Sequence, residues 1–148
     1  MSFLGELHEH DQRALRAAGQ WQRWRAGATI FREGNPSDTV LVIEIGQVKL
    51  VRTHEQGGEE LLAVVGKGDL LGELAAIDGK PRMATACAID DVEAFVIPAD
   101  AFRTAMVRQP ALGAALLSSA SQRLRSARWD PLEVSVPDTQ RRLARRTV

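Results

Sequence analysis

The residues best suited to chemistry lie between positions 71 and 85, where a glycine, a carboxylate and an arginine share one short stretch. Gly72 follows two leucines and precedes residues that favour a short helix, so backbone N–H groups near Glu73 should lack partners within that helix. Such donors attract a phosphate. Arg82 follows a Gly/Pro turn and can return to the same point with a planar, two-donor guanidinium. The stretch therefore predicts an anion site, with phosphate as the favoured anion.

Glu73 gives a second indication of the ligand. A phosphate would repel this carboxylate, so we expect it to accept a hydrogen bond from a neutral hydroxyl, such as a ribose 2′-OH. One phosphate and one ribose indicate a nucleotide. Taken singly, Gly72 could form a turn, Glu73 could be a first-turn carboxylate favoured by the helix dipole, and Arg82 could be a surface residue. The combination favours the nucleotide.

The stretch resembles the phosphate-binding cassette of cyclic nucleotide-binding domains in its segment Gly72-Glu73-Leu74-Ala75, followed by Pro81-Arg82 and Ala84-Thr85. In order and spacing, the chain is most similar to the sensor half of bacterial regulators of the catabolite-activator/FNR type. The cassette is equally similar to that of protein kinase A regulatory subunits. The resemblance covers roughly residues 5–129, through the motifs Phe31-Arg32-Glu33-Gly34-Asn35-Pro36, Gly46-Gln47-Val48, Gly66-Lys67-Gly68-Asp69 and Val96-Ile97-Pro98.

This resemblance implies a sensor that binds a 3′,5′-cyclic purine nucleotide. It favours cAMP slightly over cGMP, because Met83 offers no hydroxyl at a position where cGMP-selective members often have one. No cofactor is expected. The implied ligand residues are Gly72, Glu73, Leu74 and Ala75 at the phosphate and ribose, Arg82 on the phosphate, Met83 and Ala84 as backbone donors, Leu62, Ala63, Val64 and Leu71 along the pocket, and Arg123, Ala127 and Arg128 near the base, with Arg123 able to pair with Glu73.

The positions expected near the base depart from the family pattern. The catabolite activator has two adjacent hydroxyl residues where this chain has Ala127 and Arg128, and another where this chain has Met83. Trp129 could stack on the base instead, or cover the core as large aromatics usually do. The missing hydroxyls leave open a second interpretation, in which a domain of this fold binds no nucleotide and serves as a dimerisation and interaction module.

The composition fits one globular domain, since 148 residues with 45% hydrophobic content can bury one good core. The N-terminus lacks the basic start and apolar run of a secretory signal, so we expect a cytoplasmic protein. Cys87 is the only cysteine, which excludes a disulfide or a four-cysteine iron–sulfur cluster within the chain. His8 and His10 do not share a helix face, and no nucleophile motif is recognisable. Neither a metal site nor an enzyme is expected.

Turn residues recur at short intervals from Trp21 onward, a pattern typical of a β-sandwich or barrel. About eight strands predict an antiparallel jelly-roll (double-stranded β-helix) barrel, mainly β, with an N-terminal helix and C-terminal helices. Helical patterns cover residues 4–18, 101–107 and 110–129. The apolar stripe of the last one is wide, so one side should face the barrel and the other a second subunit in a homodimer. The alternative is a single core-facing helix.

We expect residues 1–130 to form the sensor domain and residues 131–148 to be a linker and the stub of a helix-turn-helix domain. A whole domain of that kind needs at least ~50 residues, so DNA would be contacted only through a part absent from this chain. The chain would then be a truncated regulator or a stand-alone sensor. Residues 121–148 carry seven arginines and three acids, which fits a basic tail or an ordinary solvated helix face.

Overall fold

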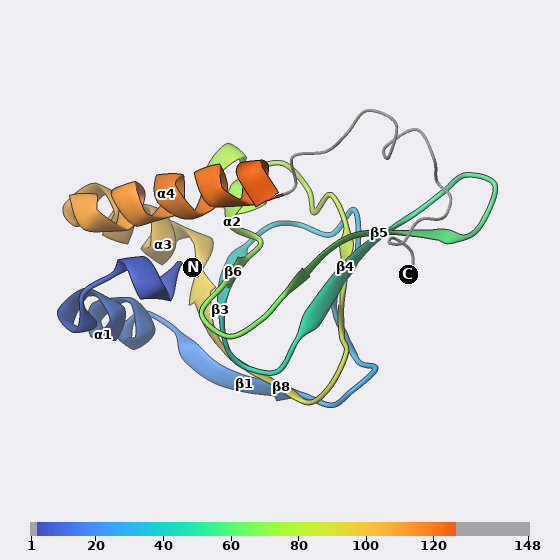
Figure 1. Ribbon diagram of the computed structural model, residues 1–148, viewed down its shortest axis with the longest axis horizontal. Helices are drawn as coiled ribbons and strands as arrows, with labels where there is room; N and C mark the ends of the chain where they lie inside the picture. Colours follow the sequence, from blue (N-terminus) through green and yellow to red (C-terminus); the bar gives the residue numbers. More distant parts are fainter. Residues whose placement is uncertain (1–2, 127–148) are drawn as a thin grey trace.

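The computed structural model describes residues 3–126 (Figure 1). Two four-stranded antiparallel sheets pack face to face, and helices lie against one of them. The eight strands of the described residues and their flanking helices confirm the predicted jelly roll. The C-terminal residues 127–148 lie outside the described residues, so the domain boundary at residue 130 stays a prediction.

The first sheet has the strand order β1-β8-β3-β6, and the second has the order β2-β7-β4-β5. The chain crosses from one sheet to the other several times. For example, β3 continues into β4 through a tight turn, and β6 leads to β7 through a short helix. The strand bounds are β1 Gln20–Trp24, β2 Thr29–Phe31, β3 Thr39–Ile45, β4 Val48–Thr53, β5 Glu59–Val65, β6 Leu70–Leu71, β7 Thr85–Ala88 and β8 Val92–Pro98.

The helices follow the predicted segments with one difference. The expected N-terminal helix over residues 4–18 is interrupted, because Leu7 and His8 are extended. The Gln12 amide joins the two pieces by donating to the carbonyls of Leu4 and Leu7, at 2.9 and 3.1 Å. The bounds are η1 Leu4–Glu6, a 3₁₀ turn, and the α-helices α1 Glu9–Ala17, α2 Glu73–Asp78, α3 Ala99–Arg108 and α4 Pro110–Ser126.

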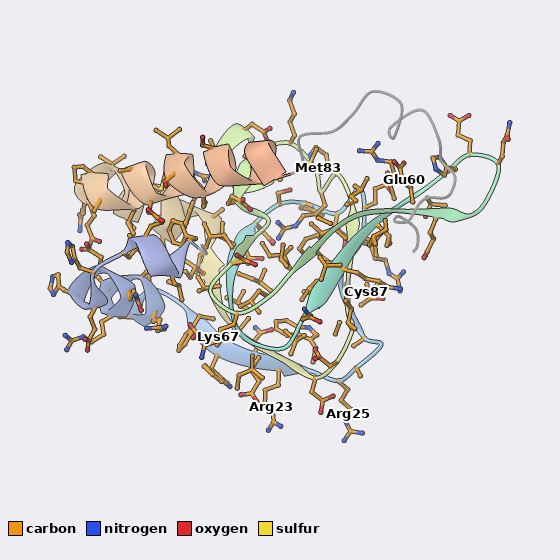
Figure 2. The ribbon with its side chains drawn as sticks, viewed as in Figure 1. Arg23, Arg25, Glu60, Lys67, Met83 and Cys87 are labelled. Carbon is orange, nitrogen blue, oxygen red and sulfur yellow. The ribbon has the colours of Figure 1, made fainter. Side chains whose placement is uncertain are left out.

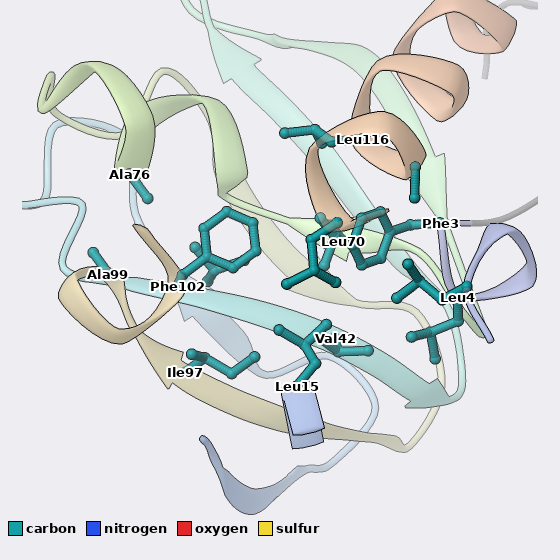
Figure 3. Packing of buried hydrophobic residues seen from close by; sticks show 14 residues of the cluster. Phe3, Leu4, Leu15, Val42, Leu70, Ala76, Ile97, Ala99, Phe102 and Leu116 are labelled. Atoms are coloured by element: carbon teal, nitrogen blue, oxygen red, sulfur yellow. The ribbon is translucent and has the colours of Figure 1, made fainter. Parts of the chain in front are cut away.

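Successive residues of β3 serve opposite faces of the first sheet, as strand geometry requires. Val40 and Val42 point to the helices, and Leu41 and Ile43 point to the second sheet. The helix-side core, shown in Figure 3, contains Phe3, Leu4, Leu7, Leu15, Val40, Val42, Leu70, Ala76, Ile97, Ala99, Phe102, Leu112, Ala115 and Leu116. The inter-sheet core contains Leu41, Ile43, Val48, Val65, Leu71, Ala86, Ala88, Val92 and Ala94.

The apolar stripe of α4 has a buried side and an exposed side. Leu112, Ala115 and Leu116 are buried in the helix-side core, while Leu117 is 74% exposed. The core-facing side is therefore present, and the outward leucine is what a subunit contact would use. Within residues 3–126, no helix combines the length and the apolar character needed to cross a membrane.

Candidate functional site

The candidate site begins where β6 ends and α2 starts. Gly72, the residue before α2, has φ 84° and ψ 11°, a left-handed conformation that side chains with a Cβ disfavour. A Cβ at this position would lie 2.2 Å from Nη1 of Arg82 and 3.4 Å from the carbonyl oxygen of Thr39. Glycine is therefore required at position 72 for two reasons. The left-handed backbone disfavours a Cβ, and the Arg82 guanidinium leaves no room for one. The group that lies close to Gly72 is the Arg82 guanidinium.

Arg82 is buried, with 4% of its surface exposed, so it is no surface residue. Its Nη2 donates to the carbonyl oxygen and to Oγ1 of Thr39, at 2.9 and 3.0 Å, and its Nη1 donates to the Gly72 carbonyl at 3.4 Å. The guanidinium carbon lies 4.1 Å from the centre of the Phe31 ring, over its face. Both terminal nitrogens are therefore held beside the start of α2.

The backbone of Arg82 is fixed by the loop between β2 and β3. The Arg82 N–H donates to the carbonyl of Asn35, and the Gly34 N–H donates to the carbonyl of Arg82, both at 2.8 Å. These bonds explain why β7 begins only at Thr85, three residues after Arg82. The residues around Arg82 bond to a loop and not to a neighbouring strand.

The Nε–H of Arg82 is buried and has no hydrogen-bond partner among the described residues. Burial lowers the pKa of the Arg82 guanidinium below its ordinary value, and the negative charge of Asp38 opposes this effect. The group stays charged at neutral pH, because the ordinary pKa of arginine lies far above 7. A buried cation with one unpaired donor is costly unless an acceptor approaches, and an anion satisfies both the charge and the donor.

The cassette residues of α2 divide into a buried and an exposed group. Glu73, the first residue of the helix, is 5% exposed, and Ala75 is also buried. Leu74, between them, faces outward. Beyond Arg82, Ala84 is buried and Met83 is 60% exposed. Met83 is labelled in Figure 2. The structure therefore gathers Glu73, Ala75, Arg82 and Ala84 in buried positions, with Gly72 half-buried beside them, and leaves Leu74 and Met83 at the surface.

The pocket-wall residues predicted on β5 do not all face one way. Ala63 pairs with Leu50, whose side chain packs against the inter-sheet core, and Leu71 lies within that core. Val64 pairs with Lys49, lies on the opposite face and is 47% exposed. Neighbouring residues of a strand point to opposite faces, so Val64 does not share the inward face of Ala63. Leu62 falls at a β-bulge and is partly exposed.

The residues predicted near the base fall at the C-terminal end of α4 and beyond it. Ala127 and Arg128 lie outside the described residues, as does Trp129. Arg123 belongs to α4, but its side chain lies outside the described part of the chain.

Sequence reasoning missed the groups that hold Arg82. Thr39 and Asp38 carried no local signal, and Phe31 was noted only as part of a longer motif. These residues also border a hollow of about 360 Å³ between β1, β2, β3 and β8, which Arg82, Trp24 and Val96 line as well. Among residues 3–126, no group of three or more His, Cys, Asp or Glu side chains could hold a metal ion.

The comparisons with known proteins agree with this geometry. The family model for the cyclic nucleotide-binding domain matches residues 21–109. The chain is 34% identical over 119 residues to a CRP-like cAMP-activated global transcriptional regulator of Mycobacterium tuberculosis, covering 80% of this chain and 53% of that protein. It is also 33% identical over 126 residues to lysophospholipase NTE1 of Mycosarcoma maydis, covering 85% of this chain and 6% of that protein.

Among solved structures, the catabolite activator protein of Thermus thermophilus superposes with a TM-score of 0.75 at 28% identity, covering 90% of this chain and 61% of that chain. This chain spans about half the length of the M. tuberculosis regulator. The family model includes residues 72–85 and covers more than half of the chain. The chain therefore belongs to the cyclic nucleotide-binding domain family.

Proposed function

We propose that this chain binds a 3′,5′-cyclic purine nucleotide, with cAMP favoured, and acts as the sensor of a CRP/FNR-type transcription regulator. The observation that carries the proposal is the buried Arg82 guanidinium at the start of α2, whose Nε–H has no acceptor within the described chain. The M. tuberculosis regulator is cAMP-activated by name, and a relative from Thermus thermophilus, 30% identical over 118 residues, is a cyclic AMP receptor protein.

In this proposal the cassette divides the ligand among its residues. Arg82 neutralises the phosphate, and backbone N–H groups from Gly72 to Ala75 and at Met83 and Ala84 donate to its oxygens. Glu73 accepts a hydrogen bond from the ribose 2′-OH. Leu62, Ala63 and Leu71 form the apolar wall, and Arg123, Ala127 and Arg128 approach the base.

Nucleotide binding would be passed to the helical elements as a shift between two conformations. The α2 helix touches the helical layer directly, because Ala76 lies in the helix-side core and its carbonyl accepts a hydrogen bond from Arg103 of α3. The outward Leu117 of α4 supports a homodimer through residues 110–129. Light scattering after size-exclusion chromatography tests that part, and a monomer at micromolar concentration would contradict it.

A second candidate is a module of the same fold that binds no nucleotide and serves dimerisation. It is favoured by Met83, which is exposed and offers no hydroxyl beside the cassette arginine. The match to a small part of lysophospholipase NTE1 is consistent with a domain that can be placed in other protein contexts.

The deciding experiment is a thermal-shift titration with cAMP, cGMP and AMP. A ligand at about 100 times its dissociation constant stabilises the folded state by ~2.7 kcal/mol, which a small domain shows clearly. We expect a shift with cAMP and none with AMP. No shift with any of the three would favour the nucleotide-free module.

The Arg82→Ala variant tests the assignment of the site. Each hydrogen bond to the guanidinium is worth ~1.5–3 kcal/mol, so nucleotide affinity measured by calorimetry should fall at least about tenfold. The matched control is Arg23→Ala, because the Arg23 side chain is 74% exposed on β1 and only weakly paired with Glu93, at 3.8 Å. Equal affinity in Arg82→Ala and the parent chain would show the cassette assignment to be wrong.

A further inference from the structure

We infer that Phe31 and the Thr39 hydroxyl are positioning residues, which together fix the plane of the Arg82 guanidinium and so direct its Nε–H toward the phosphate. The inference rests on the proposed nucleotide binding. We call these two groups, the Phe31 ring and Thr39 Oγ1, the arginine platform. Neither group would touch the nucleotide; both act through Arg82.

The position of Thr39 follows from the shortness of β6. Leu71 is the last residue of β6 and pairs with Leu41, so Thr39, two residues earlier in β3, lies beyond the end of its neighbour. On the other side of β3, where β8 lies, the Asp38 carbonyl already accepts a hydrogen bond from the Ala99 N–H at 2.9 Å. The Thr39 carbonyl is instead bonded by Arg82 Nη2, and the hydroxyl of the same residue adds a second acceptor for that nitrogen.

The position of Phe31 follows from an irregularity between β2 and β7. Thr29 pairs with Cys87, and a regular register would then pair Phe31 with Thr85. The register shifts between Thr29 and Phe31, so Phe31 pairs with Ala86, which faces the inter-sheet core. A bulge of this kind re-aims a side chain, and here it turns the ring toward the guanidinium carbon, 4.1 Å from the ring centre.

These contacts act on different motions of the same group. Hydrogen bonds to Nη1 and Nη2 hold the outer edge of the guanidinium, and a ring over its face restricts rotation of the plane. A side chain ordered before the ligand arrives loses less entropy on binding. A fixed arginine also discriminates between ligands by the position of their phosphate, because a cyclic phosphodiester is tied to the sugar at two points. A 5′-monophosphate is tied at one point and can follow an arginine that moves.

The test compares two pairs of variants by calorimetry with cAMP and AMP. Phe31→Leu removes the π face and Phe31→Tyr keeps it; Thr39→Val removes the hydroxyl and Thr39→Ser keeps it. We expect Phe31→Leu and Thr39→Val each to weaken cAMP binding by roughly threefold to tenfold and to narrow the preference for cAMP over AMP. Phe31→Tyr and Thr39→Ser should restore both values. Equal binding in all four variants, or equal losses within a pair, would overturn the inference.

A second measurement needs no nucleotide. Hydrogen exchange of the Arg82 Nε–H, followed by NMR in ¹⁵N-arginine-labelled protein, reports how firmly the guanidinium is held. We expect faster exchange in Phe31→Leu and Thr39→Val than in their matched partners, and unchanged exchange would contradict the inference. If the parent chain bound no nucleotide, the proposed function would fail, and this measurement would still decide whether the platform exists.

Discussion

The two faces of the first sheet differ in what they pack. On the outer face, the helix-side core fills the space with large apolar side chains, among them Phe3 and Phe102, which are fully buried. On the inner face, the inter-sheet core is built largely of alanines and valines, and it borders a buried arginine and a hollow of about 360 Å³. The outer face is covered by apolar side chains, and the inner face also accommodates the charged side chain of Arg82.

The difference shows how one strand can serve stability and binding together. Alternate residues of β3 contribute to each core, so the helix-side residues can stabilise the strand whose other face holds Arg82 through Thr39. Strand alternation separates the two tasks within neighbouring positions. Substitutions on the two faces should therefore have different consequences.

The largest effect on stability should come from Phe102→Ala on the helix side. Truncation of a fully buried phenylalanine lowers the free energy of unfolding by ~3–5 kcal/mol, through lost burial and the cavity that remains. Urea denaturation followed by circular dichroism measures this loss. The nucleotide affinity of the protein that remains folded should change little, and a large loss of affinity would contradict the separation of the two faces.

On the inner side, Gly72→Ala should cost less stability and more binding. The left-handed backbone penalises alanine by ~1–2 kcal/mol, and the new methyl group would displace the Arg82 guanidinium, whose Nη1 lies 2.2 Å from the Cβ position. Nucleotide affinity measured by calorimetry should therefore fall markedly.

The matched control for that variant is Gly27→Ala. Gly27 has φ 87°, close to that of Gly72, but nothing lies within 4 Å of its Cβ position. It should show the backbone penalty alone, as a lower unfolding midpoint with unchanged nucleotide affinity. Similar affinities in both variants would show that the contact between Gly72 and Arg82 does not matter for binding.

The smallest effect should come from Arg16→Met at the edge of the helix side. Arg16 of α1 makes two hydrogen bonds to the Glu44 carboxylate of β3, at 2.8 and 3.2 Å. The Arg16 side chain is 30% exposed, so solvent screening limits the pair to about 1 kcal/mol or less. A double-mutant cycle with Glu44→Gln, read by urea denaturation at low and high salt, measures the coupling. A coupling well above this range would mean that the charge pair is a main contributor to the packing of α1.

Much of the fold could be predicted because its signals are local. Gly57 and Gly58 lie between β4 and β5, where a pair of glycines favours a hairpin turn, and Asp90-Asp91 lies between β7 and β8. The helix predicted over residues 4–18 was less regular than its pattern, since Leu7 and His8 are extended. Hydrophobic spacing indicated the helical character of this region but not the break.

The site was predicted in part for the same reason. Gly72, Glu73 and Arg82 could be singled out because a glycine before a short helix and a returning arginine are visible in the chain itself. Val64 and Ala63 lie on opposite faces of β5, and the sequence does not show which residue of a strand faces inward when both are apolar.

The sequence by itself determined the family, the eight-strand pattern and the cassette, since each depends on residue types at short spacings. Only the tertiary structure decided what holds Arg82. Thr39 comes from the start of β3 beyond the end of β6, and Phe31 is turned by a register shift against β7. Contacts of this kind depend on where strands end and how they pair. They join residues that are distant in the chain, and no local sequence pattern predicts them.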